Sequence, residues 1–283
     1  ADFVMANPPF NVDDVDAEKI KNDPRLPFGL PGVNKKGAVS NGNYLWISYF
    51  YSYLNNKGRA GFVMSSQASS AGGQEAEVRR KLVESGDVGA MVAIRSNFFY
   101  TRSVPCELWF LNRNKPAHLK DRVLMLDARN VFRKVTRKIF DFSPEQLANL
   151  TAIVWLYRGE NERFLELVES YQRRMLDETA SSAEVLEAFV SQADALAAKL
   201  NDLDAETKGA LETLRTDIKR LAADSEKVST KWKSLPSDNE GLHKAAEHLE
   251  PLAETSRNLV KQVDQLYKFI EKQAKDSGER GVK

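Results

Sequence analysis

The sequence of 283 residues is poor in cysteine, histidine and long apolar runs. Its one cysteine, Cys106, cannot form a disulfide within the chain, and we expect it to be a core residue in a reducing compartment. His118, His243 and His248 lack neighbouring ligands, so no metal site is predicted. No apolar run approaches the ~20 residues that cross a bilayer, and no signal peptide is present. We therefore expect a cytoplasmic protein without a membrane partner.

Glycine-rich loops that cradle phosphates or nucleotides are also missing. Gly29, Gly32, Gly72 and Gly73 are too scattered to form one. The chain also begins inside an apolar, strand-like run. We therefore expect a fragment or a truncated form of a longer protein.

The formal net charge of +1 hides two halves of opposite sign. Residues 1–159 carry 22 Lys and Arg against 15 Asp and Glu, a charge of +7, and residues 160–283 carry 19 against 25, a charge of −6. A basic half suits a phosphate backbone as partner, although basic surfaces also simply keep proteins soluble. From about residue 160, Ala, Leu, Glu and Lys replace β-branched residues. We predict two domains, 1–159 and 160–283.

The most informative stretch is Asn7-Pro8-Pro9-Phe10, which directly follows an apolar run. The run predicts a buried strand, and the two prolines predict a stiff turn at its end. The Asn7 side chain and the Pro8 carbonyl can form a rigid pair of hydrogen-bond acceptors beside the Phe10 ring. Such a pair suits a planar ligand with an amino group, for example adenine. These four residues fit an ordinary Asn-Pro turn with Phe10 in the core equally well.

Strands and helices alternate after this motif. Apolar spacing predicts, in order, a helix at 44–54 capped by Asn43, a strand at 59–64, a helix at 74–85 and a strand at 88–94. This order is typical of a doubly wound sheet, whose ligands bind beyond the carboxyl ends of the strands, where Asn7 lies.

The segment between the motif and the first helix, residues 11–43, has no steady period. We expect a long loop that closes over the target or contacts DNA. Lys35 and Lys36 are candidate phosphate contacts within it, and a solvated pair of lysines is the alternative.

This part of the sequence resembles a known family. Asn-Pro-Pro-Phe at the end of a strand is the motif of the methyltransferases that modify adenine N6 in DNA, and residues 7–159 resemble the modification subunit of type I restriction-modification systems. The other segments that carry the resemblance are residues 43–47, 58–64, 77–82, 98–101, 104–111 and 126–129.

The resemblance implies a Rossmann-like methyltransferase with a doubly wound mixed sheet, which transfers methyl from S-adenosylmethionine to a flipped adenine. It implies catalytic roles for Asn7, Pro8 and Phe10. It also implies DNA, a specificity subunit, a second methylation subunit and a restriction subunit as partners. Members of this family carry a glycine-rich donor site upstream of the motif. Since this sequence holds none, we expect the chain alone to be inactive.

The resemblance further implies a second wall for the base pocket in residues 96–102. Phe98, Phe99 and Tyr100 are the candidates to face Phe10, and we favour Phe99 with Tyr100 as its neighbour. Ordinary core and rim packing is the alternative. The sequence has Ile94-Arg95 where relatives commonly have Leu-Pro, so the course of this loop is expected to differ from theirs.

A basic cluster follows the strand predicted at 122–127. Its members are Arg129, Arg133, Lys134, Arg137 and Lys138. We take Arg133 and Lys134 as candidate DNA contacts, with an acidic partner or a solvated surface as alternatives.

The second half predicts helices alone. Mostly apolar residues recur every seven positions from Leu186 to Leu235, the periodicity of a coiled coil or a helical bundle. Ser181 and Glu184 form a capping-box pattern that predicts a helix start, and a break near Asp204 would begin another helix.

A turn at residues 235–240 separates this series from a last helix, which Pro251 is expected to bend. Long helices joined by a short turn lie antiparallel. We therefore predict an all-α helical bundle or coiled-coil arm for subunit assembly.

Two other functions remain open at this stage. Protein-glutamine N-methyltransferases use a related Asn-Pro-Pro-aromatic turn, so the substrate could be a protein amide. The chain could also be a non-catalytic assembly module whose helical arm binds another subunit.

Overall fold

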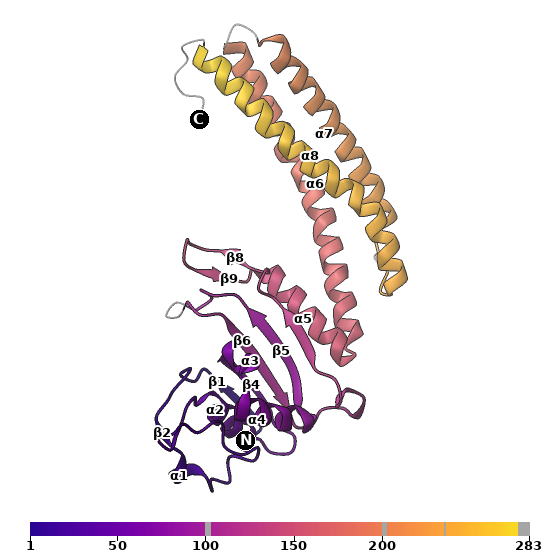
Figure 1. The fold of residues 1–283 in the computed structure, drawn as a ribbon. Coiled ribbons are helices and arrows are strands. Elements are labelled where there is room, and N and C mark those ends of the chain that lie inside the picture. The colour runs from indigo at the N-terminus through magenta and orange to yellow at the C-terminus, as the bar shows by residue number, and fades with distance from the viewer. Residues whose placement is uncertain (100–102, 200–202, 235, 277–283) are drawn as a thin grey trace. The chain divides into compact units, whose positions relative to one another are not determined.

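The computed structural model describes residues 1–99, 103–199, 203–234 and 236–276. The chain divides into two compact units, Ala1–Tyr157 and Arg158–Lys283. The first combines strands and helices and the second contains long helices (Figure 1). Tyr100 falls outside the described residues.

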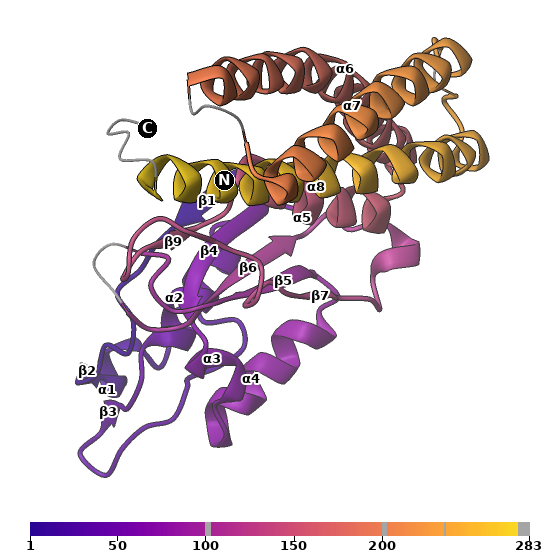
Figure 2. The same ribbon diagram turned by 90° about the horizontal axis from the view of Figure 1, so that it is seen from above.

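A mixed five-stranded sheet forms the centre of the first unit (Figure 1, Figure 2). In spatial order its strands are β1 (Phe3–Ala6), β4 (Arg59–Ser65), β6 (Cys106–Asn112), β5 (Val88–Ile94) and β7 (Leu124–Asp127). The pairs β1·β4 and β5·β7 are parallel, whereas β6 is antiparallel to both of its neighbours. The predicted mixed sheet is confirmed, although β6 separates β4 and β5.

Helices from different parts of the chain surround the sheet. They are α2 (Asn43–Ser52), α3 (Gln67–Ser70), α4 (Gly73–Glu84) and α5 (Pro144–Arg158), with a short 3-10 helix η1 (Ala117–Leu119). Tyr44 and Ile47 of α2 and Leu82 of α4 are buried in one cluster with Trp109 of β6. Leu150 of α5 packs against another cluster, which includes Val92 of β5.

Residues 11–43 contain more structure than the long loop that we predicted. Strand β2 (Val15–Asp16) pairs antiparallel with β3 (Ala38–Val39), and helix α1 (Ala17–Ile20) follows β2 directly. Ala17, Leu26 and Val39 share a small buried cluster with Leu45 of α2. Short elements escape a search for periodicity, and burial against α2 stabilises them here.

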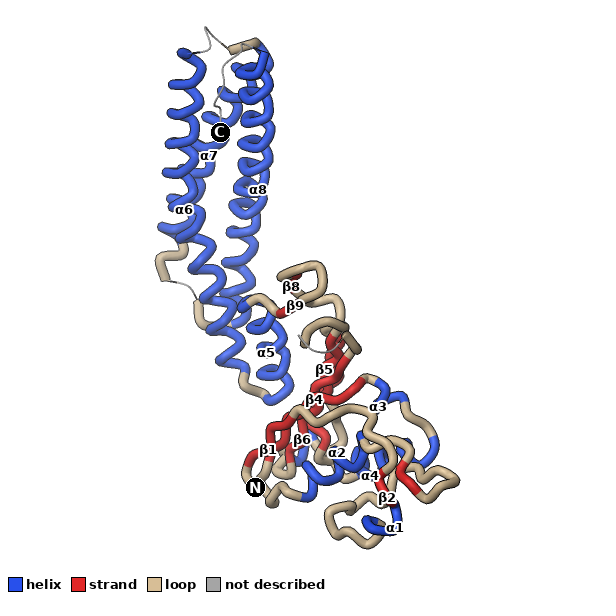
Figure 3. The backbone as a smooth tube through the Cα atoms, turned by 90° about the vertical axis from the view of Figure 1, so that its left-hand side faces the viewer, coloured by secondary structure: helices blue, strands red, loops and turns tan. Residues whose placement is uncertain are grey.

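The second unit is a bundle of three long helices, which lie side by side (Figure 3). They are α6 (Asn161–Lys199), α7 (Ala205–Lys231) and α8 (Asn239–Asp276). Its core contains Val190 of α6, Leu214 and Leu221 of α7, and Leu259 and Leu266 of α8. The predicted helical bundle is therefore confirmed as an architecture, and its role in assembly remains a prediction.

The bounds of these helices test the sequence-based predictions. The break expected near Asp204 exists, since Asp204 Oδ1 accepts a hydrogen bond from the Thr207 amide at 2.7 Å and begins α7. The helix start predicted at Ser181 is wrong. Ser181 lies inside α6, where its hydroxyl donates to the Asp177 carbonyl at 2.9 Å. Pro251 lies within α8, which continues on both sides of it.

Candidate active site

The motif turn begins where β1 stops. Ala6 is the last residue of β1 and pairs with Phe62 of β4, so Asn7 lies at the carboxyl end of a parallel strand pair. Asn7 is exposed, Pro8 is buried and Phe10 is half-buried. Phe10 packs against two hydrophobic clusters, one containing Trp109 and one containing Ile94. The Asn7 side chain makes no hydrogen bond within the described part of the chain, so its amide is available to a ligand.

Asn11, directly after the motif, has a left-handed backbone with a φ of 54°. Its amide N–H donates to Asn43 Oδ1 at 2.8 Å, and Asn43 Nδ2 donates back to Asn11 Oδ1 at 2.9 Å. Asn41 Nδ2 donates to the same Asn11 oxygen at 3.1 Å. Asparagine tolerates a positive φ better than most residues, and here two other asparagines fix it.

Asn43 is therefore not the helix cap that the sequence suggested. Gly42 occupies the cap position, and Asn43, the first residue of α2, is only 2% exposed. The sequence pattern allows both roles, because an asparagine before an apolar helical face is a common cap. The direction of the Asn43 side chain depends on residues far along the chain.

The loop after β5 supplies aromatic residues near the same cluster. Phe98 and Phe99 are half-buried and pack against the cluster of Val92, Ile94 and Cys106 that Phe10 also contacts. The Phe98 ring meets the Phe142 ring at 4.7 Å between centroids. The structure thus brings Phe10 and Phe99 to one cluster, whereas the other candidate wall residue, Tyr100, lies outside the described residues.

Arg95, directly after β5, binds a hairpin. Its guanidinium carbon lies 4.0 Å from the centroid of the Phe132 ring and 4.1 Å from that of Phe140. The hairpin strands are β8 (Arg133–Lys134) and β9 (Phe140–Asp141). The Phe140 amide also donates to the Asn97 carbonyl at 3.1 Å. Cation–π contacts and this hydrogen bond fix the hairpin to the aromatic loop.

The basic residues of the hairpin fall into two groups. Arg133 forms an ion pair with Asp141 at 2.7 Å, and its hydrogen bonds lower the pKa of the Asp141 carboxyl. Lys134, Arg137 and Lys138 are exposed and form no ion pair with any described residue. These three charges are therefore available to an anionic partner.

Two further basic positions lie elsewhere on the surface. Arg129 pairs with Asp127 at 2.7 Å and, through side-chain and backbone hydrogen bonds, lowers the pKa of Asp127 to about 2. Lys35 and Lys36 are exposed in the turn before β3, and Asn34 Oδ1 accepts from the Lys36 amide at 2.9 Å. The turn presents both lysines to solvent without fixing their side chains.

Glu107 on β6 is a site neighbour that the sequence did not single out. Its carboxylate accepts hydrogen bonds from the Ser69 hydroxyl at 2.6 Å and from Trp109 Nε1 at 3.2 Å. Because Ser69 lies in α3, the bond from its hydroxyl holds this helix, which follows β4, to β6. The apolar pattern of β6 did not indicate that a carboxylate within it accepts these hydrogen bonds.

Cys106 is a core residue, as predicted. It is 1% exposed, and burial raises the pKa of its thiol to about 11. Within the described ranges, no group of His, Cys, Asp and Glu could hold a metal ion. No described helix is both long and apolar enough to span a membrane.

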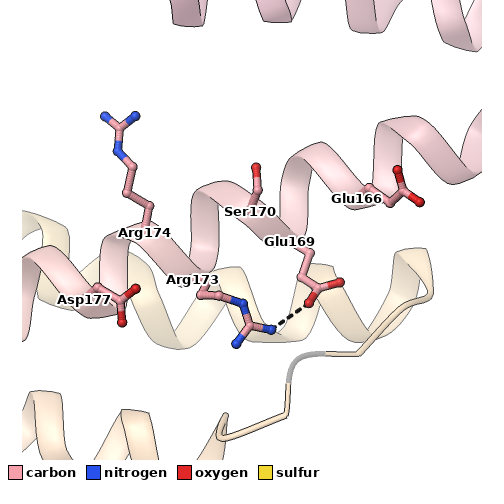
Figure 4. A pocket seen from close by; sticks show the side chains of 6 residues that line it. All are labelled: Glu166, Glu169, Ser170, Arg173, Arg174 and Asp177. Atoms are coloured by element: carbon pink, nitrogen blue, oxygen red, sulfur yellow. Dashed lines mark hydrogen bonds and ion pairs between the residues drawn. The ribbon is translucent and has the colours of Figure 1, made fainter.

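The helical unit has a charged hollow on its surface (Figure 4). Its lining comes from α6 alone and consists of Glu166, Glu169, Ser170, Arg173, Arg174 and Asp177. Arg173 pairs with Glu169 at 2.7 Å, and Arg174 pairs with Glu178 at 2.9 Å. With both guanidinium groups paired, the hollow has the character of a solvated helix surface.

Comparisons of the sequence with a protein family and with individual known proteins agree with each other. Residues 1–185 match the family described as N-6 DNA Methylase. The chain is 32% identical over 239 residues to the type I restriction enzyme MjaIX methylase subunit of Methanocaldococcus jannaschii, covering 83% of this chain and 41% of that protein. It is 33% identical over 150 residues to the HindI methylase subunit of Haemophilus influenzae, covering 53% of this chain and 32% of that protein.

Among solved structures, the methyltransferase subunit of a type I restriction-modification system from Streptococcus thermophilus is similar at 23% identity and a TM-score of 0.47. The match covers 56% of this chain and 31% of that chain. The chain thus spans less than half the length of the relatives that it matches.

Proposed function

The chain belongs to the N-6 DNA methylase family, and on that premise we propose that its first unit carries the base-binding part of an adenine-N6 methyltransferase site. The observation that supports this most is Asn7, which leaves its amide free at the carboxyl end of β1 beside Phe10. Ligands of open α/β sheets bind at such strand ends. The relatives are methylase subunits of type I restriction enzymes, and we propose the same setting here.

We propose that this turn orients the amino group of the substrate base. An adenine N6 donates two hydrogen bonds, which the Asn7 side-chain oxygen and the Pro8 carbonyl would accept. Both acceptors draw the nitrogen lone pair out of conjugation with the ring and aim it at the methyl donor, so positioning and charge stabilisation provide most of the rate. The proton leaves N6 after transfer.

S-adenosylmethionine is the proposed donor, and it supplies the methyl group. Among the described residues, Gly72 is the cap residue of α4, Gly73 is its first residue, and no glycine-rich turn follows β1. Residues 1–283 therefore offer an acceptor side without an identified donor side. We expect the donor site to need parts of the subunit that this chain does not span, and the chain alone to be inactive.

The base must leave the duplex to reach this turn, because its amino group is inaccessible inside the stack. We propose that the flipped adenine lies between Phe10 and the loop of Phe98 and Phe99, with Tyr100 as a further candidate in that loop. Aromatic rings contribute about 1–3 kcal/mol per stacked base. This arrangement favours DNA over a protein amide, since an amide offers no ring to stack.

Contacts to DNA phosphates are proposed for exposed basic residues. Lys134 of the hairpin is one of them, and Lys35 and Lys36 form a second group. Arg133 is held by Asp141, so in this proposal it stabilises the hairpin and adds charge to the same surface. The specificity subunit, a second methylation subunit and the restriction subunit are the proposed protein partners, with the three-helix bundle as the assembly element.

Substitution of Asn7 tests the function. Asn7→Ala in the full-length subunit, assembled with its partners, should lower methyl transfer to adenine by about 100-fold or more, since it removes one positioned acceptor. The measurement is single-turnover transfer to unmodified DNA, with thermal unfolding to show that the fold is kept.

Asn56 provides the matched control. It is exposed in the turn between α2 and β4, and Asn56→Ala should leave the transfer rate unchanged. A wild-type rate for Asn7→Ala would refute the assignment. Residues 1–283 alone, assayed in parallel, should show no turnover, and a measurable rate would mean that they contain the donor site.

A further inference from the structure

We propose that Asn43, at the start of α2, is a positioning residue that holds the Asn7 turn in its binding geometry through Asn11. This inference rests on the proposed function of Asn7. Asn43 would touch neither base nor donor. Its effect would pass through the backbone of the residues between Asn7 and Asn11.

The Asn7 side chain needs such a positioning residue, because no hydrogen bond of its own to a described residue holds it. Because Asn7 bonds to no described residue, only its backbone fixes where the amide points. On the amino side, the backbone is fixed by pairing of β1 with β4 as far as Ala6 and Phe62. On the carboxyl side, Phe10 packs against two hydrophobic clusters, and the first residues held by hydrogen bonds are Asn11 and Val12.

Those two residues bind the first turn of α2 closely. Asn11 and Asn43 exchange two hydrogen bonds, at 2.8 and 2.9 Å. The Gly42 amide donates to the Val12 carbonyl at 2.6 Å, and a Cβ at Gly42 would lie only 3.0 Å from that oxygen. Asn41 completes the set, since its Oδ1 accepts from the Asn43 amide at 2.9 Å and its Nδ2 donates to Asn11.

The side chain of Asn43 is directed at the motif and does not cap its own helix. Both of its polar atoms bond to Asn11, and the cap residue of α2 is Gly42, which has no side chain. A buried amide is costly unless its groups are bonded, and this pair satisfies both. Asn11 itself is exposed, so water can replace Asn43 as its partner. Loss of Asn43 should therefore loosen the turn more than it destabilises the fold.

A similar asparagine at the other end of β1 gives a matched control. Asn55 Nδ2 donates to Asp2 Oδ1 at 2.7 Å, and Asn55 Oδ1 accepts from the Lys57 amide at 2.9 Å. It ties the start of β1 to the turn after α2, away from Asn7. Because Asn55 is exposed, Asn55→Ala should cost no more stability than Asn43→Ala, and it should not change transfer.

The experiment compares these variants in the full-length subunit assembled with its partners. Asn43→Ala should reduce the single-turnover rate of adenine methylation by about 10- to 100-fold, because a displacement of about 1 Å at a reacting group can cost about 100-fold. DNA affinity should stay within about two-fold, since Asn43 makes no phosphate contact in this proposal. Hydrogen exchange in a peptide covering residues 7–12 should become faster in Asn43→Ala and stay unchanged in Asn55→Ala.

Asn11→Gly is a second variant, in case Asn43→Ala fails to fold. Glycine accepts the positive φ but lacks the side-chain oxygen that Asn41 and Asn43 bind. If the bonds between the Asn11 and Asn43 side chains position the turn, Asn11→Gly also lowers the methylation rate. The double variant with Asn43→Ala should then be little slower than either single variant. The bond from the Asn11 amide to Asn43 Oδ1 remains in this variant. If Asn11→Gly keeps the wild-type rate, the Asn11 side chain is not needed, and positioning by the paired amides is wrong.

The outcomes separate this inference from the proposed function. Wild-type enzyme that transfers no methyl to adenine would overturn both. Wild-type transfer together with an Asn43→Ala rate within about two-fold would overturn the positioning role alone. A lower rate with equal loss in Asn55→Ala would also overturn it, because the effect would then be general destabilisation.

Discussion

Single residues differ in how far the sequence discloses their role. Asn7 and the two prolines are neighbours, so a stiff turn with an acceptor at a strand end could be predicted locally. The bond between Asn11 and Asn43 could not, because the two lie 32 positions apart and an ordinary helix cap fits the same pattern. The role of Arg95 could not be predicted either, since its ring partners come from a later hairpin.

At the scale of single residues, we predict that the Cys106 thiol reacts slowly in the native protein. Burial first, and then the neighbouring Glu107, raise the thiol pKa to about 11, so the thiol stays protonated below that pH. Since the thiolate is the nucleophile, we expect native protein to react with a disulfide reagent at pH 8 far more slowly than free cysteine. Absorbance of the released reagent measures this. The same protein in urea should react fully, and rapid native reaction would contradict the burial.

Elements were predictable where their pattern is long and their surroundings simple. The helices at 44–54 and 74–85 and the strands at 59–64 and 88–94 were found within a few residues of their ends. The hairpin of β8 and β9 was not, because its two-residue strands carry no period. Tertiary contacts with Arg95 stabilise it instead.

The hairpin carries a testable consequence for DNA binding. Each phosphate contact contributes about 0.9 to the slope of log K against log salt. Replacing Lys134, Arg137 and Lys138 with Gln should therefore reduce that slope by about 2–3 and weaken binding without regard to sequence. Fluorescence anisotropy of the assembled enzyme with duplex DNA over a range of salt concentrations measures both effects.

Three lysines elsewhere make the control. Lys57, Lys219 and Lys261 are exposed and form no ion pair within the described ranges. Their replacement by Gln removes the same charge and should leave the slope nearly unchanged. Equal reductions in the two triple variants would show that net charge alone matters, and an unchanged slope in the hairpin variant would exclude the hairpin as a contact.

At the scale of the whole molecule, the two units have separate hydrophobic cores. The cluster around Leu82 and Trp109 belongs entirely to the first unit, and the cluster around Leu214 and Leu266 belongs to the second. The change in composition near residue 160 predicts two domains, 1–159 and 160–283. The composition could not predict that α6 continues without a break past Ser181. The residues of a capping box can also occur inside a helix, so the pattern alone does not show that a helix begins there.

Separate cores predict separate unfolding transitions. Leu82 and Leu214 are both 0% exposed, one in each unit. Each Leu→Ala substitution should cost about 2–5 kcal/mol of stability, confined to its own unit. Urea unfolding of the chain, followed by helical signal and by tryptophan fluorescence, should show Leu214→Ala shifting one transition and Leu82→Ala the other. A single transition shifted equally by both would mean that the units unfold together.

The position of β6 has a consequence for the order of folding. This strand lies at the centre of the sheet, yet it follows both of its neighbours in the chain, so β4 and β5 lack their shared partner until residue 112 has been synthesised. The helical bundle instead joins helices that are consecutive in the chain. Non-local pairing slows folding, and strands that have not yet paired can associate with other chains. During synthesis, the apolar strands β4 and β5 are thus the segments of the first unit most in need of a chaperone.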